Sequence, residues 1–531
     1  MDANGSRDAH SAVRGSGSGS GSGGGRSVSI SVPPAVPRPR KRTASSNGGA
    51  SLTSSIANLA NTIIGTGMVA LPGNFVHTGW LLGLFLIALC GFTGASGLYL
   101  LTRCANKLGG RRQSFFSVAM KTIPKGARWF DLAIALKCFG VSISYLIISG
   151  QLMPQVVLSF LKAAGHSHDA IPDLLLDRNF WVTLLITLLL PLCFLRKLDS
   201  LRHTSYLSLA AVCYLVVIVV FFFINPNLRG SLPPRGEVHI VVLSTHLLPI
   251  FPVFVFAFTC AQNMLPVYNE LSADDALMHM DRAQWAIGAS IGGAGCVYAV
   301  VSVLGYLEFG GTLGDNIIAM YPSSSIFVAV GRLSIVLLTI FSYPLQVHPC
   351  RAAIEKVIYP PRSGVELPTG DEDDDESADE DRQGQAEDDH DNDNRGDVDH
   401  QISLLSGASY PSHSSTAASD EMPLKRWVVI TCLILTTTFT IALLVDDLSL
   451  ILGFVGSLGS TTISFILPGV LYASLHDRND KLRRPAQALA VWGVFVGTVA
   501  LGANVLKLIR AGVTVGAGAK ADRISALLER W

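Results

Sequence analysis

Charged residues are scarce in this sequence. Asp, Glu, Lys and Arg make up 15% of the 531 residues, whereas about 25% is usual for a soluble domain. The mean hydropathy is +0.42, and the apolar residues fall in blocks of about 20, the length that crosses a bilayer as a helix. A soluble globular protein is therefore excluded, and an integral membrane protein is predicted.

The sequence also lacks the motifs of catalysis and cofactor binding. It shows no cluster with metal-ligand spacing, no nucleophile motif and no phosphate-binding glycine loop. We therefore expect no enzyme activity, no metal, no cofactor and no nucleic-acid partner. The nine cysteines fall within apolar blocks or at edges predicted to be cytosolic, so no disulfide framework is implied.

Eleven apolar segments are long enough to be transmembrane helices. Basic residues gather in the loops after the second, fourth and tenth segments, as is typical of cytosolic loops. The N-terminus is therefore predicted to be cytosolic, and the C-terminus to face the lumen or the exterior. The segments lie at residues 53–72, 79–102, 130–160, 179–196, 204–225, 242–263, 283–308, 325–347, 427–445, 449–474 and 486–509.

Two other stretches have compositions that cannot bury a core. Sixteen of the 40 acidic residues lie between Asp371 and Asp399, and outside that segment 38 basic residues face 24 acidic ones. This acidic loop is either a solvated spacer or a docking site for a cytosolic partner. The predicted order is a disordered cytosolic tail over 1–50, helices 1–8 over 51–362, a disordered acidic cytosolic loop over 363–423, helices 9–11 over 424–511, and a luminal tail over 512–531.

The first apolar segment cannot form one uniform helix. Asn58 and Asn61 place amides in it, and Gly65-Thr66-Gly67 lies near its middle, where each Gly costs about 1 kcal/mol relative to Ala. A break at membrane depth is tolerated where the freed backbone groups bind a ligand or line a cavity. Two half-helices offer N–H groups at one end and C=O groups at the other, which suits a carboxylate and a cation. The alternative is a kink that serves helix packing alone.

A second interruption lies in the sixth segment. Thr259, Cys260, Gln262 and Asn263 are polar or small residues at membrane depth, and Pro266 follows them. Corresponding interruptions in helices 1 and 6 indicate an inverted five-plus-five repeat with the binding site at its centre. The alternative is that Gln262 and Asn263 cap a helix at the cytosolic face.

Several stretches of the chain resemble one family of membrane proteins, the amino acid/auxin permeases. Its fungal vacuolar amino acid transporters and its system A/N neutral amino acid transporters are the most similar members. The resemblance covers the first ten helices and implies an all-α, LeuT-like fold of 11 transmembrane helices, with helices 1 and 6 broken. It rests on ANLANTIIGTGMVALP (57–72), KCFGVSISYLIISG (137–150), LDSLRHTS (198–205), FTCAQNMLPVYNEL (258–271), NIIAMYP (316–322) and DDLSLILGFVGSLGSTTISFILPG (446–469).

The resemblance also implies a function and a site. Members of the family carry out secondary active transport of amino acids, coupled to protons or to Na⁺. Asn61 and Ser342 match a cation site of Na⁺-coupled relatives, which would be vestigial in a proton-driven member. The substrate's carboxylate would bind the amides of the first break, and its ammonium group the backbone carbonyls of the second. The carboxylate would bind Gly65, Thr66 and Gly67, and the ammonium group would bind Phe256, Ala257, Phe258 and Thr259. Asn61 and Ile64 are further substrate-binding candidates.

The residues themselves add candidates for selectivity and coupling. Phe256, Thr259, Gln262 and Tyr145 would surround the substrate's side chain, and Gln262 favours a polar neutral one such as that of glutamine. Lys137 lies about 10 Å into the third helix. A buried lysine titrates near neutral pH, so Lys137 is a candidate proton carrier, unless its chain snorkels to the cytosolic interface.

We therefore expect a proton-coupled transporter of neutral amino acids, embedded in lipid in the vacuolar or a lysosome-like membrane. Two alternatives stay open. One is an amino acid receptor that signals through the acidic loop. The other is Na⁺- or H⁺-coupled uptake at the plasma membrane.

Overall fold

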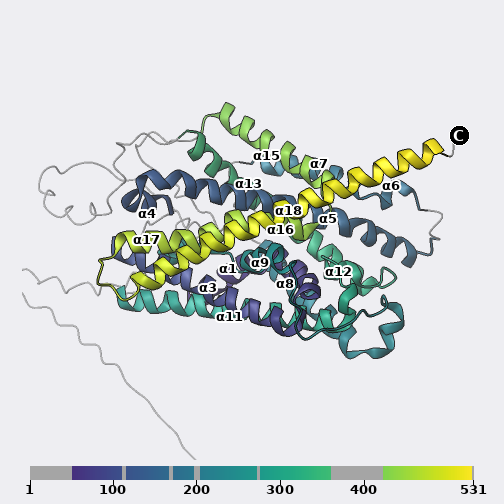
Figure 1. The fold of residues 1–531 in the computed structure, drawn as a ribbon, viewed down its shortest axis with the longest axis horizontal. Coiled ribbons are helices and arrows are strands. Elements are labelled where there is room, and N and C mark those ends of the chain that lie inside the picture. The colour runs from purple at the N-terminus through teal and green to yellow at the C-terminus, as the bar shows by residue number, and fades with distance from the viewer. Residues whose placement is uncertain are drawn as a thin grey trace, which may run out of the picture. The chain divides into compact units, whose positions relative to one another are not determined.

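The computed structural model of this chain consists of helices joined by short connections (Figure 1). It describes residues 51–109, 115–166, 171–195, 204–271, 276–359 and 422–528. The N-terminal tail and almost all of the acidic loop lie outside these described residues, so the predictions made for them stay predictions.

The helices follow the chain in the order that the apolar segments predict. Eight spans are long and apolar enough to cross a membrane, or nine with the bent first pair, and two shorter apolar helices accompany them in the described residues. The total of eleven therefore stays a prediction. The bounds are α1 Leu52–Ile63, α2 Thr66–Asn74, α3 Gly79–Leu108, α4 Phe115–Thr122, α5 Ala127–Ala163, α6 Asp173–Leu176, α7 Arg178–Cys193, α8 Thr204–Ile224, α9 Leu247–Ala257, α10 Ala261–Glu270, α11 Ala276–Phe309, α12 Ile317–Met320, α13 Ile326–Ile358, α15 Leu424–Leu444, α16 Leu448–Val455, α17 Leu467–Leu475 and α18 Arg483–Leu528.

Both predicted breaks are present. The axes of α1 and α2 differ by 51° across a gap of two residues. In the sixth span, α9 ends at Ala257 and α10 begins at Ala261, so the unwound segment is Phe258 to Cys260. Pro266 lies inside α10 rather than at the break. The described residues are helical with the first and sixth spans broken, which confirms the all-α class with two broken helices.

Several helices begin at a capping side chain. The Ser51 hydroxyl accepts a hydrogen bond from the backbone N–H of Ser54 at the start of α1. Asp177 caps α7 in the same way, and Asp447 caps α16 by accepting from the Leu450 N–H at 2.8 Å. Such caps satisfy N–H groups that have no partner inside the helix.

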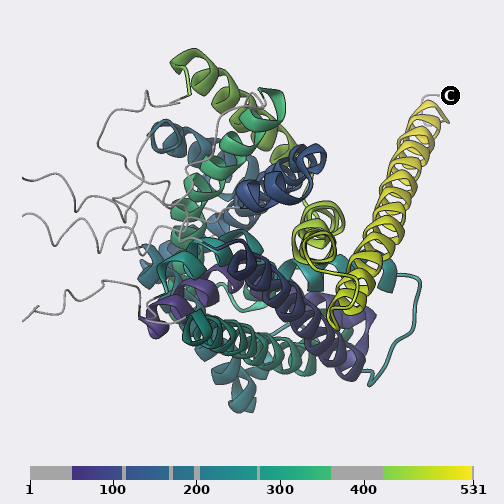
Figure 2. The same ribbon diagram turned by 90° about the vertical axis from the view of Figure 1, so that its left-hand side faces the viewer.

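Two groups of helices pack closely among themselves, and α8 and α16 contact members of both groups. In the first group, α11 packs against α1, α2 and α3, while α2 also contacts α9 and α10 contacts α3. In the second, α5 packs along α13 and also contacts α7 and α15. The C-terminal helix α18 stands at the edge of the helices in Figure 2, and it runs to Leu528, past the predicted boundary at 511.

The tenth span is not a regular helix, which the sequence analysis did not anticipate. Between α16 and α17 the chain forms two π-helical turns, Gly456–Ser460 and Thr462–Ile466. A Cβ atom at Gly456 would collide with the backbone of Pro252 in α9, and one at Gly459 would lie 2.8 Å from the Cβ of Lys137 in α5. These two glycines therefore let the π-helical turns lie directly against two neighbouring helices.

The substitution Gly456→Ala tests this packing. Its methyl group would meet the Pro252 backbone, which has no rotamer to change, and overpacking of this kind costs about 1–3 kcal/mol. We expect a lower midpoint of thermal unfolding in detergent. Gly502→Ala in α18 is the control, because no atom lies within 4 Å of the added carbon. Equal midpoints for the two variants would contradict the packing argument.

Candidate binding site between two broken helices

The two breaks lie side by side in the protein interior. Gly67 in the first turn of α2 faces Ala257, the last residue of α9. A Cβ atom at position 67 would lie 3.0 Å from the Cβ of Ala257 and 3.1 Å from its Cα. Any side chain larger than that of glycine would therefore push α2 away from α9, and the structure brings together the two backbone segments that the sequence analysis assigned to one site.

The second halves of both broken helices begin without a cap. Among the described residues, no side chain caps α2 at Gly65 or α10 at Cys260, in contrast to α1, α7 and α16. At α2, the carbonyl of Gly65 accepts a hydrogen bond from the N–H of Met68 at 3.2 Å. The first-turn N–H groups have no partner within their helix and carry the positive end of its dipole. The segment Gly65–Gly67 thus has the character of an anion site.

The first halves of the same helices end on one shared side chain. The hydroxyl oxygen of Tyr298 in α11 lies 2.6 Å from the carbonyl oxygen of Ile63 and 2.9 Å from that of Ala257. Tyr298 is fully buried, and its ring meets that of Phe258 edge to face at a centroid distance of 5.3 Å. Sequence reasoning missed this residue, although a tyrosine among small and apolar residues at mid-membrane signals that its hydroxyl has a partner.

Polar side chains connect the breaks to their neighbours. The Thr259 hydroxyl donates to the carbonyl of Val255 at 2.9 Å and accepts from the hydroxyl of Ser464 in the second π-helical turn at 3.4 Å. The Asn263 side-chain amide donates to the hydroxyl of Thr62 at 2.6 Å. Asn263 therefore links α10 to α1 rather than only ending a helix.

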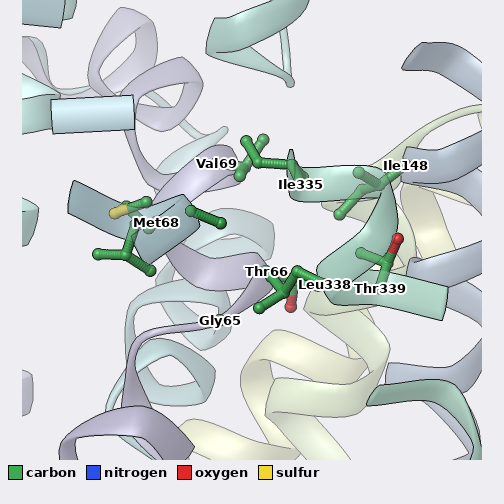
Figure 3. A pocket seen from close by; sticks show the side chains of 10 residues that line it. Gly65, Thr66, Met68, Val69, Ile148, Ile335, Leu338 and Thr339 are labelled. Atoms are coloured by element: carbon green, nitrogen blue, oxygen red, sulfur yellow. The ribbon is translucent and has the colours of Figure 1, made fainter. Parts of the chain in front are cut away.

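A small cavity opens at the first break (Figure 3). Its volume is about 10 Å³, which is room for about one water molecule and not for an amino acid. The hydroxyl of Thr339 forms a hydrogen bond of 2.6 Å with that of Ser149. Apart from Thr66 and Thr339, the lining is apolar: Gly65, Met68 and Val69 from the first span, Ile148 from α5, Ala211 and Val212 from α8, and Ile335 and Leu338 from α13.

Two predicted polar residues are buried near the second break. Lys137 is 4% exposed, so it does not snorkel to an interface, and its Cβ lies against Gly459 of the first π-helical turn. The side-chain oxygen of Gln262 is buried and has no hydrogen-bond partner in the part of the chain that the structure describes. A buried acceptor without a partner is costly unless a ligand supplies the donor.

The remaining predicted site residues are Phe256, Tyr145, Ser342 and Asn61. Phe256 and Tyr145 are both 8% exposed. Tyr145 lies close to Ser342 and Gln346 of α13, while Asn61 lies in α1, which packs mainly against α11. A cation site between Asn61 and Ser342 therefore stays a prediction.

Comparisons with known proteins match most of the chain. A family model described as transmembrane amino acid transporter protein matches residues 48–510. Vacuolar amino acid transporter 5 of Schizosaccharomyces pombe is 36% identical over 475 residues, which cover 87% of this chain and 96% of that protein. Vacuolar amino acid transporter 6 of Saccharomyces cerevisiae is 32% identical, with 84% of this chain and 97% of that protein covered.

More distant similarities were also found. Sodium-coupled neutral amino acid transporter 7 of Xenopus laevis is 28% identical over 58% of this chain and 66% of that protein. A solved structure, the inward facing conformation of Mhp1, aligns with a TM-score of 0.47 and 12% identity over 88% of this chain and 91% of that chain.

The contact between Gly67 and Ala257 can be tested directly. Gly67→Ala should separate α2 from α9 and lower the uptake of a labelled amino acid by up to about 100-fold, because small displacements of a binding group are that costly. Gly293→Ala in α11 is the control, since no atom lies within 4 Å of its added carbon. Normal uptake by folded Gly67→Ala protein would show that the breaks need not touch.

Proposed function

Because the chain belongs to the transmembrane amino acid transporter family, we propose that it is a secondary active transporter of neutral amino acids, driven by a proton gradient. We further propose that it resides in the membrane of a vacuole or lysosome-like organelle, which the names of its fungal relatives support. The observation that carries the proposal is the contact between two helix breaks with opposite polarity. The uncapped start of α2 lies against the carbonyl end of α9.

This geometry suits a zwitterion. The carboxylate of an amino acid would bind the N–H groups of Gly65–Gly67, and its ammonium group the carbonyls of Phe256–Thr259. Helix ends supply both partial charges without a full charge in the bilayer, which would cost at least about 2.5–3.5 kcal/mol. The first broken helix has no Asp, Glu, Lys or Arg between residues 52 and 74, and the second has none between 247 and 269. A substrate with a charged side chain would thus find no counter-charge on either helix, which favours neutral amino acids.

Gln262 supplies a means of selecting the side chain. Its buried oxygen lacks a donor, and the amide of a glutamine substrate would provide one. An apolar substrate of similar length would leave the oxygen without a partner. We therefore propose that polar neutral amino acids such as glutamine are preferred over leucine.

Proton coupling is assigned to Lys137. A protonated lysine is poorly solvated in the position where Lys137 lies, against the π-helical turns and next to the second break. A movement that admits water on one side would stabilise the protonated form, and closure would favour release of the proton. Asn61 and Ser342 are the alternative, as a Na⁺ site.

Alternating access follows from the two packing groups. The cavity at the first break has no room for a substrate, so the site must open for one to enter. We propose that the group formed by α1–α3 and α9–α11 rocks against the group formed by α5, α7, α13 and α15. The acidic loop would contact a cytosolic partner without being needed for transport.

Proteoliposomes with an imposed gradient test the coupling. A difference of one pH unit provides about 1.4 kcal/mol per proton and should drive about tenfold accumulation of labelled glutamine. Lys137→Met should abolish this accumulation but leave exchange of glutamine across the membrane without a gradient. Lys162→Met, at the exposed end of the same helix α5, is the control and should accumulate normally. Accumulation driven by Na⁺ alone would indicate that Asn61 and Ser342 form the coupling site. Uptake that does not change with either gradient would exclude coupled transport.

Selectivity is tested at Gln262. Loss of one hydrogen bond is worth about 0.5–1.5 kcal/mol, so Gln262→Ala should lower the ratio of kcat/KM for glutamine over leucine roughly two- to tenfold. Gln487→Ala on the exposed side of α18 serves as the matched variant with no expected effect. If the glutamine/leucine ratio of kcat/KM is unchanged in Gln262→Ala, this residue does not contact the substrate's side chain.

A further inference from the structure

One hydroxyl group serves two interrupted helices. In an unbroken helix, the carbonyl of Ile63 would accept a hydrogen bond from residue 67, and that of Ala257 from residue 261. The breaks remove both donors, and at this depth an unsatisfied carbonyl costs several kcal/mol. The Tyr298 hydroxyl lies within hydrogen-bond distance of both oxygens, at 2.6 Å and 2.9 Å. The hydroxyl has one proton, so Tyr298 supplies from a third helix a single donor that the carbonyl ends of α1 and α9 share.

The position of this hydroxyl is fixed by close packing. The Tyr298 ring is fully buried against Phe258. The Phe258 ring lies beside Gly91 of α3 and Gly295 of α11, where added Cβ atoms would be at ordinary contact distances of 3.4 Å and 3.7 Å. The buried rings of Tyr298 and Phe258 thus place the hydroxyl between the two helix ends.

The same hydroxyl borders the proposed carboxylate segment. A Cβ atom at Gly67 would lie 3.5 Å from the Tyr298 oxygen. Tyr298 therefore contacts the carbonyl ends of α1 and α9 and adjoins the first turn of α2. These are the elements whose separation determines how far apart the two charges of a bound zwitterion must be.

We propose that Tyr298 sets the distance between the anion-binding and cation-binding ends of the site, and thereby selects α-amino acids over amino acids with more widely separated charges. The inference rests on the function proposed above. In an α-amino acid one carbon separates the carboxylate from the ammonium group, and in a β-amino acid two carbons do. Helix ends held by one rigid hydroxyl fit the shorter spacing, whereas ends free to spread accommodate both.

The test compares alanine with β-alanine, which share a composition and differ in this spacing. Tyr298→Phe keeps the ring and its contact with Phe258 but removes the hydroxyl. We expect the ratio of kcat/KM for alanine over β-alanine to fall toward one, with a higher KM for alanine. Hydrogen–deuterium exchange over residues 62–68 and 256–262 should rise in the substrate-free protein.

Tyr306→Phe is the matched control. Tyr306 lies in the same helix, is equally buried, and its hydroxyl accepts a hydrogen bond from the backbone N–H of His239 at 3.1 Å, away from the breaks. Its loss should lower thermal stability without changing the ratio or the exchange at the breaks. A purely structural role for Tyr298 would give the two variants the same behaviour.

Each outcome decides the inference. An unchanged alanine/β-alanine ratio in Tyr298→Phe overturns it. If that variant does not fold, Phe258→Leu keeps the hydroxyl but loosens it, and should give an intermediate ratio, so an unchanged ratio there also overturns it. Should the wild-type protein transport no amino acid, the proposed function fails instead, and exchange at the two breaks alone then shows whether Tyr298 holds them together.

Discussion

The need to satisfy backbone groups inside a bilayer is the constraint on which the site depends. A continuous helix meets that need by itself, and two broken spans do not. The structure supplies hydrogen-bond partners to the freed backbone groups at one side of the breaks and not at the other. At the carbonyl ends of α1 and α9, Tyr298 supplies a donor. At the N–H ends of α2 and α10, no side chain among the described residues supplies an acceptor. This difference gives the site its polarity, because the N–H ends are left for an anion, while the carbonyl oxygens beside Tyr298 keep a lone pair for a cation.

Close backbone approach is the second requirement, and glycine provides it. Gly67 lets α2 meet α9, Gly456 lets the first π-helical turn meet α9, and Gly459 lets the same turn cover Lys137. At Gly459 the first π-helical turn lies against the backbone and Cβ of Lys137, which is 4% exposed.

The sequence predicted the breaks because their signals are local. Gly65-Thr66-Gly67 is costly in a helix whatever surrounds it, and so are the polar residues that precede Pro266. Tyr298 could not be found in this way, because its role depends on two carbonyls 235 and 41 residues away in the chain. The same holds for Lys137, whose two open alternatives differ only in what packs over it. The π-helical turns are an intermediate case. The glycines of GSLGS mark an unusual stretch of sequence, but they do not predict the turn type or the contacts with α5 and α9.

A bound amino acid would supply hydrogen-bond partners that the protein lacks at the breaks. Its carboxylate would supply the acceptor that α2 lacks, and a glutamine side chain would supply the donor that Gln262 lacks. Under the proposed alternating access, both interactions would form only with the two packing groups closed around the ligand, which would give the ligand a higher affinity for the closed form than for the open one. A ligand shifts a conformational equilibrium by its difference in affinity for the two states. In the proposed mechanism, the polar groups left without partners at the breaks would be the features by which substrate binding drives closure, and closure would control the solvation of Lys137.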